Sequence, residues 1–358
     1  CFRFAMSALQ EKLGSMMVGS LVVPTIALGK RLGLFEALAE VASESVPADA
    51  KTVADKAGCK ERYVREWLAV LSCAGFIEVT PDEKFWLTEE AKHEFTGLNN
   101  LLVAEMSYIP AIMKNFYHLA DAFKKDGRDG LEYSQFTEFY DAWDVLTKAM
   151  DDLHLIKNYI PFIGMNENLE AGGLKVLDVG CGAGYQAQKM ASTYPKCEIH
   201  GADISEIAIE KAREKHQGLN NLTFHIEDAA KMPSEWTETF DFITIFDACH
   251  DQMRPDLSLK EIHRMLKPGG LFAMLEIRGS SNIHTDKSSN RGPCGYAISL
   301  FHCLPVGSNR QDALCLGMLW GEERARKLIE ETGFKSENVQ VLHPDFFPAN
   351  VVYLCKKE

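Results

Sequence analysis

The chain has 358 residues, of which 46% are apolar and 25% are charged, and its formal net charge is −13. This composition is typical of a globular protein, and the length predicts two domains. The acidic charge argues against a nucleic-acid partner and against an anionic membrane surface, since both require a basic face.

We expect no membrane-spanning helix. The longest apolar run near the start, LVVPTIAL (21–28), is short and contains a proline. The first residues do not form a secretory leader, and we interpret residues 1–5 as a remnant or an incomplete start, with Met6 as the natural beginning.

Ten cysteines are spread along the chain without a CxxC pair or a Cys/His cluster at zinc-ligand spacing. This usage predicts reduced thiols in a cytoplasmic protein and no metal.

Residues 6–95 predict a winged-helix domain. The apolar residues of ALGKRLGLFEALAE (27–40) have helical spacing. A short helix is predicted at 52–57 and ends at Gly58, and a second helix follows it and ends at Gly75. FIEVTPDEKFWLT (76–88) predicts a hairpin around a Pro-Asp turn. Helix, turn, helix and hairpin is the order of a winged helix.

Residues 96–163 predict a helical cover and connector with two long helical segments, 100–125 and 136–160, rich in aromatic residues and methionine. GMNENLEAGG (164–173) is the best candidate for a linker, since it combines three glycines with polar residues.

Residues 174–358 predict an α/β domain with a parallel sheet, because strand and helix patterns alternate. The expected strands are 175–179, 198–202, 223–226, 240–246, 271–277, 339–343 and 351–355. The expected helices are 185–192, 205–216, 257–266, which KPGG would end, and 322–332.

A glycine-rich turn joins the first strand of this domain to its helix. Gly180, Gly182 and Gly184 are spaced G-x-G-x-G, which differs from the pyrophosphate-binding G-x-G-x-x-G. Such a turn lets a ligand approach the backbone closely. Asp203, at the end of the second strand, is placed to accept hydrogen bonds from ribose hydroxyls, and Asp228, after the third, to accept one from an exocyclic amine.

These residues, with the FDFITIFDA strand and LKPGG (266–270), resemble the class I S-adenosylmethionine-dependent methyltransferases. The resemblance covers residues 174–277 closely and implies a Rossmann-like seven-stranded domain that binds S-adenosylmethionine and releases S-adenosylhomocysteine. The cofactor-binding residues that it implies are Asp178, Gly180, Cys181, Gly182, Gly184, Asp203, Ile204, Asp228, Ala229 and Phe246. Cys181 is interpreted as a small side chain and not as a nucleophile.

The winged helix before this domain is similar to that of two-domain small-molecule methyltransferases, in which it forms a dimer and covers the pocket. The stretches 300–323 and 343–357 resemble a bacterial and invertebrate subset, some of which are thought to methylate small thiols. The resemblance therefore implies a homodimer, and a thiol or hydroxyl acceptor held between the two domains.

His250 and Asp251, just after the fourth strand, are the catalytic candidates, because histidine has the pKa of a general base. A loop histidine hydrogen-bonded to its neighbours is the alternative. Residues 278–320 form a long insertion that predicts an ordered helical flap over the acceptor. The substrate-binding candidates are Tyr108, Met113, His302, Cys303 and Trp320, each of which could equally be a packing residue.

Two other functions stay open at this point. A winged-helix regulator with a cofactor-sensing domain would need a basic recognition helix, but residues 60–66 hold three bases against two acids. A catalytically inactive, dimerising homologue is the other, and the complete set of cofactor motifs argues against it.

Overall fold

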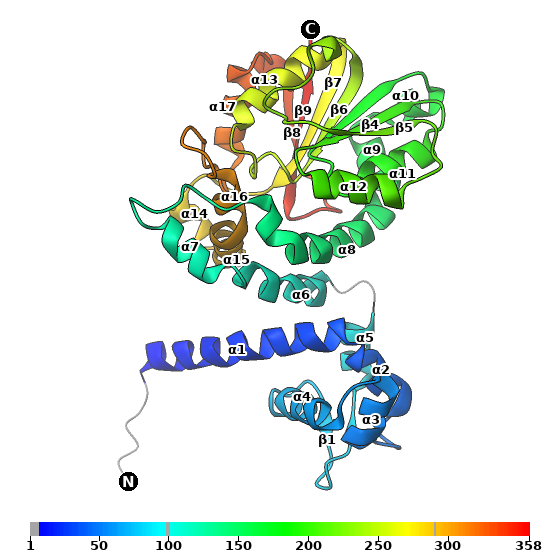
Figure 1. Ribbon diagram of the computed structural model, residues 1–358, viewed down its shortest axis with the longest axis vertical. Helices are drawn as coiled ribbons and strands as arrows, with labels where there is room; N and C mark the ends of the chain where they lie inside the picture. The colour runs from blue at the N-terminus through cyan, green and yellow to red at the C-terminus, as the bar shows by residue number, and fades with distance from the viewer. Residues whose placement is uncertain (1–6, 98–100, 290) are drawn as a thin grey trace. The chain divides into compact units, whose positions relative to one another are not determined.

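The computed structural model describes residues 7–97, 101–289 and 291–358 (Figure 1). The proposed natural start at Met6 lies outside these residues. The chain divides into two compact units, one made of residues up to Lys114 together with Glu138–Ala149, the other of Asn115–Thr137 and Met150–Glu358. Each is described separately.

The first unit begins with two helices, α1 (Ala8–Arg31) and α2 (Leu34–Val41). The sequence predicted a single helix over 27–40. The structure breaks it at Gly33, whose φ of 65° lies in the left-handed region that a helix cannot continue through.

By length and composition alone, α1 meets the requirements of a membrane-spanning helix. Its best 18-residue window has a mean hydropathy of 1.4 and is 17% buried. We did not expect such a helix, because the run 21–28 is short and contains Pro24, which the structure nevertheless places inside α1. One helix of this kind is weak evidence for a membrane, since core helices of other proteins meet the same requirements.

The winged-helix order is present. Helices α3 (Ala50–Ala57) and α4 (Glu61–Cys73) are followed by the two-stranded antiparallel hairpin β1 (Glu78–Val79) and β2 (Phe85–Trp86), and then by α5 (Glu89–Thr96). Their core is built around Phe35, which stacks on Phe95 and meets the edge of Trp67. The predicted helices that end before Gly58 and Gly75, and the predicted hairpin, are therefore confirmed.

The connecting helices are shorter than predicted. The segment 100–125 forms α6 (Leu101–Met113) and α7 (Phe116–Ala122), and the segment 136–160 forms α8 (Thr137–His154), a π-helical turn (Leu155–Tyr159) and α9 (Ile160–Phe162). The predicted linker instead contains a helix, α10 (Asn166–Ala171), because Leu169 is buried in the core of the second unit.

The second unit is built on a seven-stranded sheet in the order β5-β4-β3-β6-β7-β9-β8 (Figure 1). The strands are β3 (Lys175–Val179), β4 (Glu198–Asp203), β5 (Leu222–Ile226), β6 (Phe240–Phe246), β7 (Leu266–Ile277), β8 (Val339–Leu342) and β9 (Asn350–Lys356). All pairs from β5 to β7 are parallel, and β9 pairs antiparallel with both of its neighbours. From β3, the chain first adds strands on one side, β4 and β5, and then on the other, beginning with β6. The carboxyl ends of β3 and β6 therefore form the crevice where ligands bind in such sheets.

Helices cover both faces of this sheet, which gives it two cores (Figure 1). One face packs against α10, α11 (Tyr185–Thr193) and α12 (Glu206–Lys215), and the other against α13 (Pro255–Met265) and α17 (Glu322–Glu331). The prediction that KPGG (267–270) ends α13 is wrong, because these residues lie in β7. The helix ends at Met265 and β7 begins at Leu266, because Leu266 already pairs with Phe240 beside a register shift.

The insertion, described at 278–289 and 291–320, has the predicted helical segments joined by longer non-helical stretches, and its role as a flap over the acceptor stays a prediction. It contains α14 (Ile283–Asp286), α15 (Gly292–Ile298), a π-helical turn (Ser299–Cys303) and α16 (Leu304–Gly307). π-Helical turns are frequent at functional sites.

Candidate functional site

The glycine turn follows β3 at the carboxyl edge of the sheet. Gly180 and Cys181 both donate backbone hydrogen bonds to the carbonyl of Ala202 on β4, at 2.7 and 3.1 Å. A Cβ on Gly184 would lie 2.4 Å from the Phe224 ring, whereas one on Gly182 would meet no atom within 4 Å. Gly184 is therefore required by packing, while Gly182 borders open space in which a ligand could lie.

Asp203 holds this turn in place. One carboxylate oxygen accepts from the backbone N–H of Gly182 at 2.9 Å, and the other from that of Ser205 at 2.8 Å, next to the start of α12. Burial raises the pKa of Asp203, and these two backbone donors oppose the rise. Ile204 beside it is 44% exposed.

Cys181 is buried, and burial first, with the nearby Asp203 carboxylate, raises the pKa of its thiol well above the usual value. A protonated, buried thiol is a poor nucleophile, which agrees with its interpretation as a small side chain.

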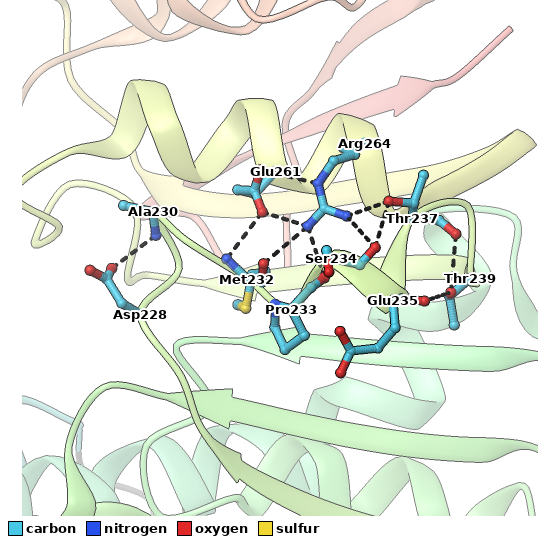
Figure 2. Close-up of polar contacts among 10 residues, drawn as sticks. All are labelled: Asp228, Ala230, Met232, Pro233, Ser234, Glu235, Thr237, Thr239, Glu261 and Arg264. Carbon is cyan, nitrogen blue, oxygen red and sulfur yellow. Dashed lines mark hydrogen bonds and ion pairs between the residues drawn. The ribbon is translucent and has the colours of Figure 1, made fainter.

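The loop after β5 carries Asp228, whose carboxylate accepts from the backbone N–H of Ala230 at 2.9 Å (Figure 2). Arg264 of α13 donates to the carbonyls of Met232 and Pro233 and to the Glu261 carboxylate, at 3.2, 3.1 and 2.5 Å. Glu261 in turn accepts from the backbone N–H of Met232 at 3.0 Å. One ion pair on α13 thus fixes the loop that follows Asp228 (Figure 2).

Two further carboxyl groups lie at the ends of the central strands. Asp178, the fourth residue of β3, accepts from the Thr244 hydroxyl at 3.1 Å, and burial raises its pKa to about 7. Asp247 follows Phe246 of β6 with a φ of 47°, and accepts from the Asn350 amide at 2.7 Å. Burial, and then the Glu276 charge, raise its pKa to about 8. A strained backbone at a strand end is common at functional sites.

His250 is buried and paired with Glu276 of β7. The imidazole Nδ1 lies 2.7 Å from one carboxylate oxygen, and the backbone N–H of His250 donates to the other at 3.1 Å. Both residues are at most 3% exposed. Burial by itself would lower the pKa of His250, but the Glu276 and Asp251 carboxylates raise it well above its usual value. The other ring nitrogen, Nε2, lies beside the Asp251 carboxylate.

Three more side chains, those of Asp251, His302 and Cys303, belong to the surroundings of His250. Asp251 lies 3.3 Å from His250 Nε2 and 3.7 Å from His302 Nδ1, and its backbone carbonyl accepts from the Tyr133 hydroxyl at 2.7 Å. Burial lowers the pKa of His302 to about 4 and raises that of Cys303 to about 12. We call His250, Asp251, Glu276, His302 and Cys303 the acceptor cluster.

The acceptor cluster brings together residues that the sequence placed far apart. Ligand atoms of His250, Asp251 and Cys303 lie within 4.8 Å of one another, a grouping that could hold a metal ion and that sequence spacing did not reveal. The expectation of no metal therefore stays a prediction, to be tested below.

Three other predicted substrate residues lie within their own units. Tyr108 packs in the first unit against Phe139 and Trp143, with ring centroids 5.6 and 5.9 Å away. Met113, in the same unit, is 43% exposed, and Trp320 is buried in a sheet core. A substrate role for these three residues stays a prediction.

Sequence reasoning missed Glu276, Asp247, Tyr133 and Asn350. Glu276 had a signal, because it is an acid within an apolar strand, FAMLEI. Tyr133 and Asn350 had none, since both reach the site only through tertiary contacts.

Comparisons with known proteins agree with this arrangement. Residues 170–333 match the model of a methyltransferase domain, and residues 20–96 match that of an Rv2258c-like winged helix-turn-helix domain. A demethylmenaquinone methyltransferase from Staphylococcus aureus is 35% identical over 105 residues, which are 29% of this chain and 43% of the relative. The match therefore spans less than half of that protein's length.

Solved structures share the fold over the whole chain. A putative O-methyltransferase from Nostoc punctiforme has a TM-score of 0.71 at 16% identity, covering 99% of this chain and 100% of its own. Human N-acetylserotonin methyltransferase, solved in complex with S-adenosylmethionine, has a TM-score of 0.63 at 18% identity and covers 99% of both chains. Residues 170–333 are therefore similar to a methyltransferase domain and residues 20–96 to an Rv2258c-like winged helix-turn-helix domain, and the solved structures share the fold of both.

Proposed function

We propose that this protein is an S-adenosylmethionine-dependent methyltransferase that acts on a small molecule with a thiol or hydroxyl acceptor. The observation that carries the proposal is the buried pair of His250 with Glu276, held at the same sheet edge as the glycine turn. One end of this edge suits a nucleoside, and the other supplies a base.

The residues at the edge fit S-adenosylmethionine. Open space at Gly182 allows the cofactor's chain to approach the backbone, Asp203 offers carboxylate oxygens to a ribose, and Ile204 offers an exposed apolar face to the adenosine. Asp228 and Ala229 are proposed to meet the adenine, on the loop that Arg264 holds. When bound, the cofactor supplies a methyl group already activated by a sulfonium charge.

In this proposal, His250 takes the proton of the acceptor at Nε2, and Glu276 holds the imidazole by its other nitrogen. Asp251, His302 and Cys303 line the space in front of Nε2 and exclude water from it. Alignment of two reactants in this way can lower a barrier by about 7–11 kcal/mol. A general base typically adds a factor of about 10²–10⁴.

The basicity of His250 favours sulfur over oxygen. A thiol has a pKa of about 8.5 and a phenol one of about 10, and each pKa unit is worth about 1.4 kcal/mol. Proton transfer to the same imidazole is therefore about 2 kcal/mol easier from the thiol. The Glu276 and Asp251 carboxylates, which raise the pKa of His250, stabilise the imidazolium that forms when the neutral imidazole takes the thiol's proton.

A DNA-binding regulator is a weaker proposal for this chain. On α4, Arg62 is paired with Glu66 at 2.5 Å and Arg65 with Glu83 at 2.7 Å. Arginines already paired with acids in this way are poorly placed to neutralise phosphates. The homodimer, the cytoplasmic location and a pocket between the domains stay predictions.

The test combines cofactor calorimetry with a labelled-methyl screen over small thiols, phenols and amines, followed by mass spectrometry of the products. We expect that S-adenosylmethionine binds and that the product carries the methyl group on the sulfur of a thiol or the oxygen of a hydroxyl. We also expect that His250→Gln lowers kcat at least about 10²-fold. His263→Gln on α13, a histidine that packs against Phe334, is the matched control and should leave kcat unchanged. No cofactor binding, or a product only on nitrogen, would refute the proposal.

A further inference from the structure

Carboxyl groups from three different elements converge beside the glycine turn, and none of them forms an ion pair with a described lysine, arginine or histidine. Asp151 lies in the last turn of α8, Asp178 in β3 and Asp247 directly after β6. Asp151 and Asp178 are 6% and 1% exposed. Tyr159, at the end of the π-helical turn, is fully buried and packs on Phe246 with ring centroids 5.3 Å apart. We call Asp151, Asp178, Asp247 and Tyr159 the carboxyl cluster.

Several buried oxygens in this cluster lack a hydrogen-bond donor. Asp151 Oδ2, Asp178 Oδ2 and the Tyr159 hydroxyl oxygen have no partner among the residues that the structure describes. An unsatisfied buried oxygen destabilises the folded protein, and a charged one does so more strongly. Oxygens from three separate elements left unpaired at one place indicate that a donor from outside the chain completes the cluster.

The charges around the cluster show that this donor should be a cation. Burial first, and then the charges of Asp178 and Asp247, raise the pKa of Asp151 well above its usual value. Lys189, whose charge acts weakly in the opposite direction on Asp151, is ion-paired with Asp152 at 2.6 Å. Beyond the cluster, the charged groups that act on Asp247 are Glu276, His250 and Asp251.

We infer that the carboxyl cluster binds the α-ammonium group of the cofactor's methionine part, and that Asp151 is its main acceptor. The inference rests on the proposed function, because it assigns part of the same ligand. A primary ammonium has three N–H donors, which matches the unpaired oxygens of Asp151, Asp178 and Tyr159. Asp151 lies outside residues 170–333, so it is a contribution of the connector helix and not of the matched methyltransferase domain.

The local fold explains how Asp151 and Tyr159 come to face the cluster together. Eight positions apart, they would differ by about 80° around a regular helix of 3.6 residues per turn. The π-helical turn Leu155–Tyr159 between them adds a residue to the turn and changes this angle.

The test compares two ligands that differ only in the amine. S-adenosylhomocysteine carries the ammonium without a sulfonium charge, and 5′-S-(3-carboxypropyl)-5′-thioadenosine is the same molecule without its amino group. In calorimetry, we expect Asp151→Asn to lower the affinity for S-adenosylhomocysteine at least tenfold. The same change should alter the affinity for the deamino ligand less than threefold. Asp152→Asn is the matched control, because Asp152 is the neighbouring, more exposed acid, and it should affect neither ligand.

A second measurement needs no variant. Calorimetry of the unaltered protein near pH 7 in two buffers of different ionisation enthalpy reports proton release, and an ammonium that enters the cluster should displace a proton. We expect release with S-adenosylhomocysteine and less with the deamino ligand.

Equal weakening of both ligands by Asp151→Asn, or no weakening, would overturn the assignment, as would equal proton release with both. If the unaltered protein binds neither ligand at millimolar concentration, the proposed function fails as well. That outcome is distinct from normal binding without selectivity for the amine.

Discussion

Replacing Glu276 by glutamine tests whether the buried ion pair with His250 exists and matters. The change keeps the size of the side chain and removes its charge, 2.7 Å from the imidazole Nδ1. Removing one partner of a buried ion pair leaves the other charge uncompensated and typically costs about 3–5 kcal/mol. Because glutamine can still form one hydrogen bond, we expect the lower limit, about 3 kcal/mol. For a unit of this size, that lowers Tm by roughly 6–12 °C.

The pH dependence has a definite sign. The pKa of His250 is raised in the folded protein above its usual value of about 6.5. The pair therefore contributes its full stability below pH of about 6.5, and loses it as pH rises through the folded pKa. The Tm difference between the unaltered protein and Glu276→Gln should be largest near pH 6 and should shrink toward pH 9.5.

The assay is calorimetric or spectroscopic thermal unfolding from pH 6 to 9.5, following the transition of the sheet-containing unit. Glu198→Gln is the matched control, since Glu198 also contacts a histidine, His200, at 3.0 Å but is about half exposed. It should shift Tm by little, because exposed pairs are worth about 0–1 kcal/mol. A Tm difference for Glu276→Gln that is absent, or that grows with pH, would refute the reasoning.

Three further outcomes follow from the site. Gly184→Ala should destabilise the protein and abolish cofactor binding, because the new Cβ would lie 2.4 Å from the Phe224 ring. Gly182→Ala should cost only about 1–2 kcal/mol, the strain of a left-handed backbone at a residue with a side chain. Unfolding curves measure the loss of stability in each variant, and calorimetry measures its affinity for the cofactor. Arg264→Ala removes the hydrogen bonds that hold the loop after Asp228, and calorimetry should show an affinity for S-adenosylmethionine at least about tenfold lower. An unchanged affinity would show that other contacts hold the loop. We predict that the acceptor cluster works without a metal, so elemental analysis should find less than one ion per chain and EDTA should leave methyl transfer unchanged; a stoichiometric metal whose removal stops transfer would contradict this.

Most strands and helices of the second unit could be predicted from the local pattern of apolar and polar residues. Strands 175–179 and 240–246 were predicted with the bounds that the structure has, because buried parallel strands read as continuous apolar runs between glycines and polar residues. The errors arose where tertiary contacts override such signals. KPGG is a typical helix end, yet pairing with β6 extends β7 back to Leu266, and burial of Leu169 makes a helix of a glycine-rich linker.

The sequence by itself determined the sheet, the glycine turn and the acids that follow its strands, because each depends on residues close together in the chain. Only the tertiary structure decided what surrounds them. Glu276 meets His250 across 26 positions, and Asp151 comes within range of Asp178 and Asp247 from a helix before the domain. Such groups find one another through the packing of strands and helices, since a carboxylate's partner is set by distance in space and not by spacing along the chain.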